Sequence, residues 1–161
     1  MTARIANTAS VDPAAEIDVD VEIGPFSVVG PHARIASGTR LLNSVTVMGH
    51  VTIGHENIIY PNVVLGGEPQ DISYAGSDTQ VVIGDRNVIR EGVTINRGSE
   101  KEDGITKLGD GNFLMACCHV AHDCKLGDHI IMANGALLGG HVHIDDYASL
   151  SGAVAVHHFT T

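Results

Sequence analysis

The sequence predicts an all-β protein: a left-handed parallel β-helix, built from hexapeptide repeats, in one domain over residues 1–161. Aliphatic side chains recur every six residues along most of the chain, and small or β-branched side chains form a second column four positions after them. Glycine often follows the aliphatic residue, as tight corners require. A six-residue period fits neither a helix nor a hairpin sheet. It suits three short strands per eighteen-residue coil, with the coils stacked as a solenoid.

The aliphatic column indicates where each strand lies. It runs in steps of six over residues 5–65, resumes over residues 83–95, and resumes again over residues 108–156. Every member is isoleucine, leucine, valine or methionine, so we expect the column to fill the centre of each coil. An ordinary β-sandwich would not keep so regular a repeat.

Two polar segments interrupt the repeat, near residues 66–82 and 96–107. We expect both to protrude from the coil as loops, and loops on a rigid scaffold are where binding residues gather. Asn57, Asn87 and Asn112 stand in the corner column close to these interruptions. We interpret them as residues that stabilise turns.

The cysteines have a structural interpretation. Cys118 and Cys124 fall in the corner column among alanines and valines, where we expect them to be buried and inert. Cys117 lies off that column, and no base is placed beside it. An odd number of clustered cysteines is not the framework of a secreted disulfide protein, so we expect a reducing, cytoplasmic environment.

Composition excludes several classes of function. Nineteen acidic residues against nine basic ones give a formal charge of −10, which argues against a general nucleic-acid or anionic-membrane binder. The amino-terminal "MTARIANTAS" lacks the apolar core of a signal peptide, and no apolar run is long enough for a transmembrane helix. With aromatic residues at 4% and no tryptophan, the core must be narrow.

The segment "HVAHDC" (119–124) concentrates residues capable of chemistry. Because residues eighteen apart lie on neighbouring coils, we expect His122 to stack against Gly140, and Gly140 against His158. Asp123 should likewise stack against His141. These residues would share one edge of the solenoid, about 5 Å apart from coil to coil.

Three interpretations of this edge compete. In the first, its histidines and Asp123 are ordinary solvated turn residues. In the second, imidazoles converge on zinc at about 2.1 Å. In the third, His119, His122 and Asp123 face outward and His122 is a general base oriented by Asp123. Gly140 would then leave room for a reacting group and offer its N–H to an oxyanion.

Several longer segments carry a family resemblance. They resemble the UDP-N-acetylglucosamine 3-O-acyltransferases, cytoplasmic enzymes that begin lipid A synthesis in Gram-negative bacteria. The segments are "IGPFSVVGPHARIASGT" (23–39), "QDISYAG" (70–76), "IGDRNVIREGVTINRG" (83–98), "HVAHDCKLGD" (119–128), "LLGGHVHIDDYASLSG" (137–152) and "AVHHF" (155–159).

The resemblance implies an activity, partners and an assembly. A 3-hydroxyacyl or related acyl group would pass from acyl carrier protein to the 3-hydroxyl of UDP-N-acetylglucosamine. The family is a homotrimer with active sites between neighbouring β-helices, and the loop at 66–82 would reach toward the adjacent subunit. No metal or other cofactor is implied.

The resemblance also implies residue roles. His122 would be the general base, Asp123 its orienting partner, and the Gly140 N–H the donor to the thioester oxyanion. The substrate-binding residues would be Gln70, Asp71, His119, His141, His157 and His158, with Asp71 and His141 holding the glucosamine and His119 and His157 lining the cleft.

The chain departs from the family pattern in three places. Ser73 stands where a lysine usually follows the "QD" pair, so one contact to the nucleotide's negative charge is missing. His158 stands where glutamine is usual, and either takes over that contact or perturbs it. The family continues beyond Thr161 with further coils and a helical C-terminal domain, which are absent here.

We therefore expect a fragment or a truncated form with an open end, and weak or no acyltransferase activity from this polypeptide alone. Two alternatives remain. One is a metal-dependent hexapeptide protein of the carbonic anhydrase kind. The other is a trimeric solenoid that has lost catalysis.

Overall fold

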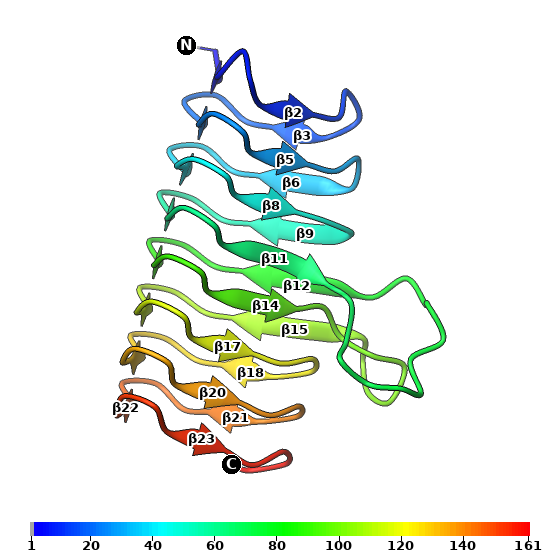
Figure 1. Ribbon diagram of the computed structural model, residues 1–161, viewed down its shortest axis with the longest axis vertical. Coiled ribbons are helices and arrows are strands. Elements are labelled where there is room, and N and C mark those ends of the chain that lie inside the picture. The colour runs from blue at the N-terminus through cyan, green and yellow to red at the C-terminus, as the bar shows by residue number, and fades with distance from the viewer. Residues whose placement is uncertain (1) are drawn as a thin grey trace.

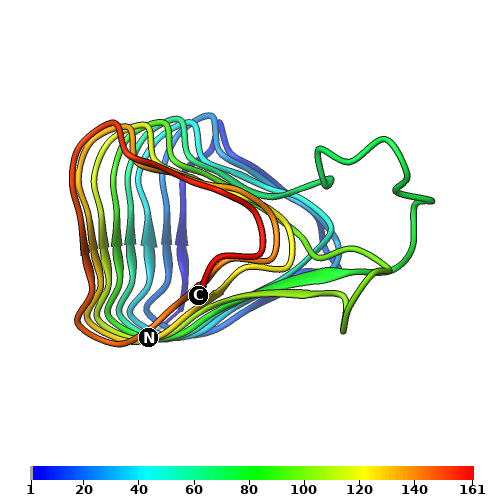
Figure 2. The same cartoon turned by 90° about the horizontal axis from the view of Figure 1, so that it is seen from below.

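Short parallel strands wind into a left-handed β-helix in the computed structural model, which describes residues 2–161 (Figure 1). Seen along its axis, the coil has three sides, and each side is one parallel sheet (Figure 2). This confirms the predicted fold class. No helix in the described residues is long and apolar enough to cross a membrane.

The three sheets take every third strand in turn. The first sheet contains β1 (Arg4–Ile5), β4 (Glu22–Ile23), β7 (Arg40–Leu41), β10 (Ile58–Ile59), β13 (Val88–Ile89), β16 (Phe113–Leu114), β19 (Ile131–Met132) and β22 (Ser149–Leu150). The second sheet contains β2 (Ser10–Val11), β5 (Val28–Val29), β8 (Thr46–Val47), β11 (Val64–Gly67), β14 (Thr94–Asn96), β17 (His119–Val120), β20 (Leu137–Leu138) and β23 (Ala155–Val156). The third sheet contains β3 (Glu16–Ile17), β6 (Ala33–Ile35), β9 (His50–Ile53), β12 (Gln80–Ile83), β15 (Ile105–Leu108), β18 (Lys125–Leu126) and β21 (His143–Ile144).

The aliphatic column forms the core, as predicted. Its members from Ile23 to Leu138 are buried, and they pack against the second column along the axis. Ile5 in the first coil is 44% exposed, because a neighbouring coil covers it on one side alone. Apolar burial of this kind is the dominant favourable contribution to folding.

Two excursions leave the coil at one corner and extend together from the prism (Figures 1 and 2). The first excursion is residues 68–79 and the second is residues 97–104. Both are shorter than the sequence indicated, because strand pairing continues into the bases of the loops. Residues 80–83 of β12 pair along their full length with β9 on one side and β15 on the other.

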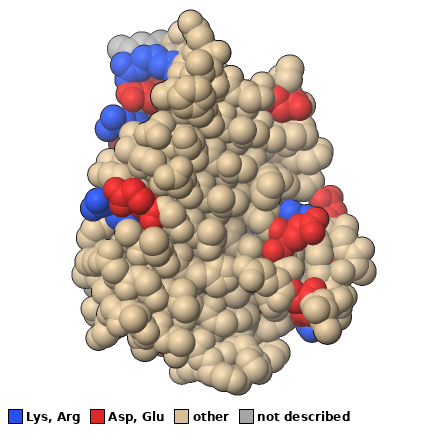
Figure 3. Space-filling view, in the orientation of Figure 1, with Lys and Arg blue, Asp and Glu red and all other residues tan. Residues whose placement is uncertain are grey.

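The outer surface of the second sheet carries no Lys, Arg, Asp or Glu among its outward residues. In each strand of this sheet one residue points outward and the next points into the core. Figure 3 shows the broad uncharged centre of this face, with charged side chains toward its edges. The outward residues are Ser10, Val28, Thr46, Val64, Thr94, His119, Leu137 and Ala155.

A ladder of buried asparagines spans the coils that carry the excursions. The Asn87 N–H and side-chain amide both donate to Asn57 Oδ1, at 2.9 and 3.0 Å. Asn87 Oδ1 accepts from the Asn112 N–H at 2.8 Å, and Asn112 Oδ1 accepts from the Ile130 N–H at 2.7 Å. The interpretation of these residues as turn stabilisers is confirmed, and the ladder keeps the coils aligned where 30 or 25 residues separate its members.

The ladder predicts a large cost for its central residue. Asn87→Ala removes the side-chain amide that donates to the Gly109 carbonyl and, as the second of two donors, to Asn57 Oδ1, and it leaves the Asn112 N–H without its acceptor. We expect the free energy of unfolding to fall by about 3 kcal/mol, measured by denaturant titration. Asn43→Ala, at an exposed position, is the control and should change it by less than about 0.5 kcal/mol. Equal effects of the two substitutions would contradict the role of the ladder.

Candidate functional site

The sequence-predicted site residues converge at the corner of the prism where the excursions begin. All but Asp123 line two adjoining hollows, which together we call the histidine cleft; the shared wall is formed by His122, Gly139, Gly140 and His158. Gln70, His119 and His157 line one hollow, and Asp71 and His141 line the other. The structure thus brings residues from both excursions and from three successive coils to one place.

His122 lies in the turn after β17, stacked on the next coil as the eighteen-residue register predicts. The His141 N–H donates to the His122 carbonyl at 3.0 Å. The His122 ring lies against Gly140 so closely that a Cβ there would stand 2.6 Å from ring atom Cε1. The room expected at Gly140 for a reacting group is therefore occupied by this imidazole, and a larger residue would displace it.

Asp123 is hydrogen bonded to His122 and fully buried. His122 Nδ1 lies 2.9 Å from Asp123 Oδ2, and the side chain of Asp123 has 0% exposure. Because an ionised carboxylate accepts hydrogen bonds only, the Nδ1 atom carries the proton and Nε2 is left as the basic atom. The positive charge that His122 gains when it accepts a proton would lie beside a carboxylate.

The expectation that Asp123 faces outward is wrong. The second excursion covers it: the Ser99 N–H donates to Oδ1 at 2.8 Å, and the Ser99 hydroxyl donates to Oδ2 at 2.5 Å. Asp123 has φ of 62°, and its own N–H donates to Thr106 Oγ1 at 2.9 Å. These contacts hold the carboxylate in one orientation toward His122.

His141 is enclosed on several sides. Its side chain is 4% exposed, and its ring stacks on Phe159 with centroids 4.3 Å apart. Its Nδ1 lies 2.7 Å from Glu102 Oε1, and its Nε2 lies 3.7 Å from Asp123 Oδ2. The His122 ring meets it edge to face at 5.1 Å.

Asp71 reaches the cleft from the first excursion and is held there by the second. Its Oδ2 lies 2.5 Å from Lys101 Nζ, and its Oδ1 accepts from the Ser73 N–H and hydroxyl. The Lys101 hydrogen bond, followed by those of Ser73, lowers the pKa of Asp71 well below its ordinary value. The sequence has Ser73 where the family it resembles has a lysine. A lysine is nevertheless present beside Asp71, and it is Lys101 of the second excursion.

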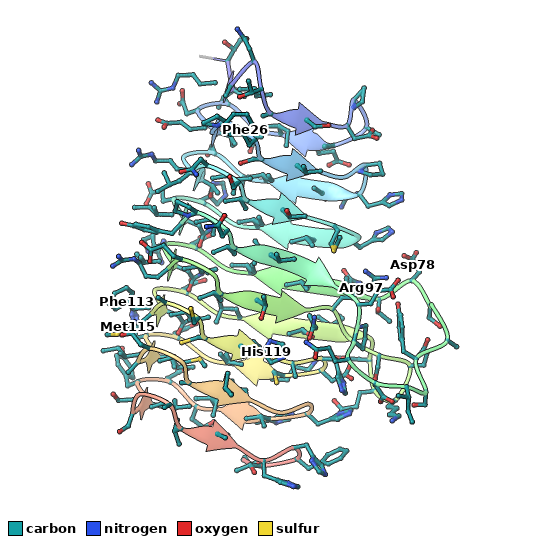
Figure 4. All side chains as sticks on the ribbon, viewed as in Figure 1. Phe26, Asp78, Arg97, Phe113, Met115 and His119 are labelled. Carbon is teal, nitrogen blue, oxygen red and sulfur yellow. The ribbon has the colours of Figure 1, made fainter. Side chains whose placement is uncertain are left out.

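Arg97 anchors the first excursion at the base of the second. Figure 4 shows it beside the protruding loop, with Asp78 further along that loop. Its guanidinium donates to the Gly66 carbonyl at 2.9 Å and the Tyr74 hydroxyl at 3.2 Å, and pairs with Glu68. These contacts fix the segment that carries Gln70 and Asp71.

The histidines at the other side of the cleft have distinct environments. His119 lies on the outer face of the second sheet (Figure 4), with Nδ1 2.7 Å from Thr94 Oγ1. Burial lowers the pKa of His119, which favours its neutral form. The ring centroids of His157 and His158 lie 3.9 Å apart, with His157 in the first hollow and His158 in the wall that the two hollows share.

Sequence reasoning missed three residues of the second excursion that contact the site. Ser99 holds Asp123, Lys101 holds Asp71, and Glu102 holds His141. The interruption of the six-residue repeat located this loop, but loops lack the fixed register that places residues on coils. The cluster of polar residues in "SEKED" was the available signal.

One group of atoms has a composition suited to a metal. One ring nitrogen each of His122 and His141 and one carboxylate oxygen of Asp123 all lie within 4.8 Å of one another. Two imidazoles and a carboxylate converge here, whereas the zinc interpretation of the sequence had imidazoles alone. Oδ2 already accepts from the Ser99 hydroxyl and from His122 Nδ1, so the residues as arranged fit a hydrogen-bonded network better than a metal ion.

The cysteines lie apart from this chemistry. Cys118 and Cys124 are buried in the core, which confirms their structural interpretation, while Cys117 is exposed. Burial raises the pKa of the Cys124 thiol to about 12 and also raises that of Cys118. Neither buried thiol is suited to act as a nucleophile, since the thiolate is the reactive form.

Comparisons with known proteins agree with the fold. The bacterial transferase hexapeptide (six repeats) family matches residues 105–140. An acyl-[acyl-carrier-protein]–UDP-N-acetylglucosamine O-acyltransferase from Herminiimonas arsenicoxydans is 53% identical over 106 residues, 66% of this chain and 40% of that protein.

Solved structures extend the likeness to nearly the whole chain. A crystal structure of a UDP-N-acetylglucosamine acyltransferase aligns with a TM-score of 0.96 and 46% identity, over 97% of this chain and 60% of that one. The corresponding enzyme from Francisella novicida aligns with a TM-score of 0.95 and 45% identity, over 96% of this chain and 56% of that one. The chain thus spans about two-fifths of the length of the curated relative and somewhat more than half of these structures.

The burial of the cysteines predicts selective labelling. In the native protein at pH about 8, an aromatic disulfide reagent should react rapidly with one thiol per chain, Cys117, and slowly with the other two. All three should react rapidly in denaturant, as absorbance of the released thiolate will show. Rapid reaction of three thiols in the native state would contradict the burial of Cys118 and Cys124.

Proposed function

Because the chain is homologous to part of the UDP-N-acetylglucosamine O-acyltransferases, we propose that it carries the catalytic β-helix of such an enzyme. The reaction is transfer of a 3-hydroxyacyl or related acyl group from acyl carrier protein to the 3-hydroxyl of UDP-N-acetylglucosamine, the first step of lipid A biosynthesis. The observation that carries the proposal is the pairing of His122 Nδ1 with the buried Asp123 carboxylate at 2.9 Å, beside Gly140 in the cleft.

His122 is the general base in this proposal. Its Nε2 accepts the proton of the sugar 3-hydroxyl as that oxygen attacks the thioester carbonyl carbon. A carbon–oxygen bond forms, the carbon–sulfur bond breaks, and the proton passes from His122 to the departing sulfur. Asp123 stabilises the intermediate imidazolium, a role supported by its burial and by its two hydrogen bonds from Ser99.

Gly140 stabilises the oxyanion. Among the described residues, its N–H donates to no backbone or side-chain acceptor, whereas the neighbouring Gly139 N–H donates to the Val156 carbonyl at 2.9 Å. A free N–H beside the base is the type of donor that lowers the energy of a tetrahedral intermediate. The absence of a side chain at position 140 also lets the His122 ring lie against the backbone.

The remaining predicted residues bind the nucleotide sugar. Asp71 and His141 hold the glucosamine, with Gln70, His119, His157 and His158 lining the cleft around it. Lys101 adds a positive charge to the hollow that contains Asp71, and this charge favours the binding of an anionic substrate there.

We further propose that the protein acts in the cytoplasm as a homotrimer. The uncharged outer face of the second sheet supports an interface between copies, since charged residues are depleted at interface centres (Figure 3). Ile72, on the first excursion, is fully exposed and would be covered by an adjacent subunit.

The assignment of His122 predicts the effect of its removal. His122→Ala should lower transfer from 3-hydroxyacyl carrier protein to UDP-N-acetylglucosamine by about 10²- to 10⁴-fold, or to background if the native chain is already slow. Product is measured with a radiolabelled nucleotide sugar, which detects weak turnover. Binding of the nucleotide sugar, measured by calorimetry, should change little.

His129→Ala is the matched control. His129 is also a histidine at a turn, but it stacks on Tyr147 away from the cleft. We expect native transfer and native unfolding behaviour from this variant. Transfer by His122→Ala at the native rate would contradict the base assignment, and absence of nucleotide-sugar binding by the native protein would contradict the proposed substrate.

A further inference from the structure

We propose that Glu102 is a positioning residue that fixes the ring tautomer of His141, so that Nδ1 carries the proton and Nε2 is presented as a hydrogen-bond acceptor. The role of this acceptor in binding substrate rests on the function proposed above, whereas the assignment of the tautomer is independent of that function. The ligand group that fits such an acceptor is an uncharged donor, a hydroxyl or an amide N–H of an amino sugar.

The hydrogen bond between Glu102 and His141 determines which nitrogen is protonated. Glu102 Oε1 lies 2.7 Å from His141 Nδ1. An ionised carboxylate has lone pairs and no proton to donate, so Nδ1 must be the donor. This is the tautomer opposite to the one that free histidine prefers in water, and the partner at Nδ1 is what selects it.

Packing prevents the His141 ring from flipping, a rotation that would exchange the positions of its two nitrogens. Phe159 covers one face of the His141 imidazole with centroids 4.3 Å apart and an interplanar angle of 10°. His122 approaches from another side at 5.1 Å. With its side chain 4% exposed, the ring keeps Nδ1 toward Glu102 and Nε2 toward Asp123.

In the neutral ring, Nε2 is then left without a protein donor among its described neighbours. Asp123 Oδ2 lies 3.7 Å from it, which is too far for a hydrogen bond, and this oxygen is itself an acceptor. His141 lines the hollow shared with Asp71 and Gly140. A substrate hydroxyl or amide that enters this hollow can donate to Nε2, and a protonated Nε2 would repel that donor.

Of the three carboxylates in this turn, Glu102 is the one that contacts His141, while Glu100 and Asp103 have other hydrogen-bond partners. Glu100 accepts from the N–H groups of Ala75 and Ser77 and joins the two excursions. Asp103 pairs with Lys125 at 2.7 Å and accepts from the Ile105 N–H. Each carboxylate of this turn therefore has its own contact, which makes Asp103 a matched control for Glu102.

The test reads the tautomer directly. In protein with ¹⁵N-labelled histidine at pH about 8, where ordinary imidazoles are neutral, the ring shifts of His141 should show a protonated Nδ1 and an unprotonated Nε2. The signals are assigned by their loss in His141→Asn. Glu102→Ala should convert His141 mainly to the Nε2–H form, because Asp123 is then the remaining carboxylate near the ring.

Two further variants separate charge from contact. Glu102→Gln should largely keep the Nδ1–H form, since the amide oxygen also accepts. Asp103→Ala removes the same charge from the same turn and should leave the His141 shifts unchanged. An Nδ1–H form that persists in Glu102→Ala, or an Nε2–H form in the native protein, would overturn the proposal.

Binding of UDP-N-acetylglucosamine supplies the second readout. Calorimetry should show about tenfold weaker binding for Glu102→Ala and native binding for Asp103→Ala. Native affinity in Glu102→Ala despite a changed tautomer would overturn the role in binding. If the tautomer changes as expected but the native protein binds no nucleotide sugar, the positioning role of Glu102 stands and the proposed function fails.

Discussion

The register between parallel coils is the constraint on which the other features of this protein depend. Each coil donates its backbone N–H groups to the carbonyls of a neighbouring coil, so residues eighteen apart lie side by side. Apolar columns in the centre hold that register, because a shift of the chain would move aliphatic residues out of the core. His122 and Gly140 meet in the cleft for this reason, without a specific contact having to bring them together.

The two excursions supply the contacts that the register of the coils does not provide. Coil stacking alone places His122, Asp123 and His141 at one corner and lets His122 pair with Asp123, but it leaves Asp123 Oδ1 and His141 Nδ1 without partners. The second excursion supplies those partners through Ser99 and Glu102 and excludes water from Asp123. A buried carboxylate next to an imidazole costs free energy unless it is hydrogen bonded, so the loop is what makes this arrangement stable.

Much of this could be predicted from the sequence, because a repeat converts residue numbers into positions. The fold, the core cysteines, and the stacking of His122 on Gly140 followed from counting in sixes and eighteens. Counting places backbone atoms and says nothing about what covers them, which is why Asp123 was wrongly expected to face outward. Counting in eighteens also fails across an insertion: Asn57 and Asn87 lie on neighbouring coils but are 30 residues apart. The contacts that the second excursion makes with the site could therefore be found only from the structure.

In the proposed reaction His122, oriented by Asp123, is the base that acts on a sugar hydroxyl. The most direct measurement is a crystal structure of the protein with UDP-N-acetylglucosamine bound. We expect the 3-hydroxyl oxygen to lie about 2.6–3.2 Å from His122 Nε2, with Nδ1 still hydrogen bonded to Asp123. A nucleotide sugar bound with its 3-hydroxyl directed away from His122 would show that His122 is not the base.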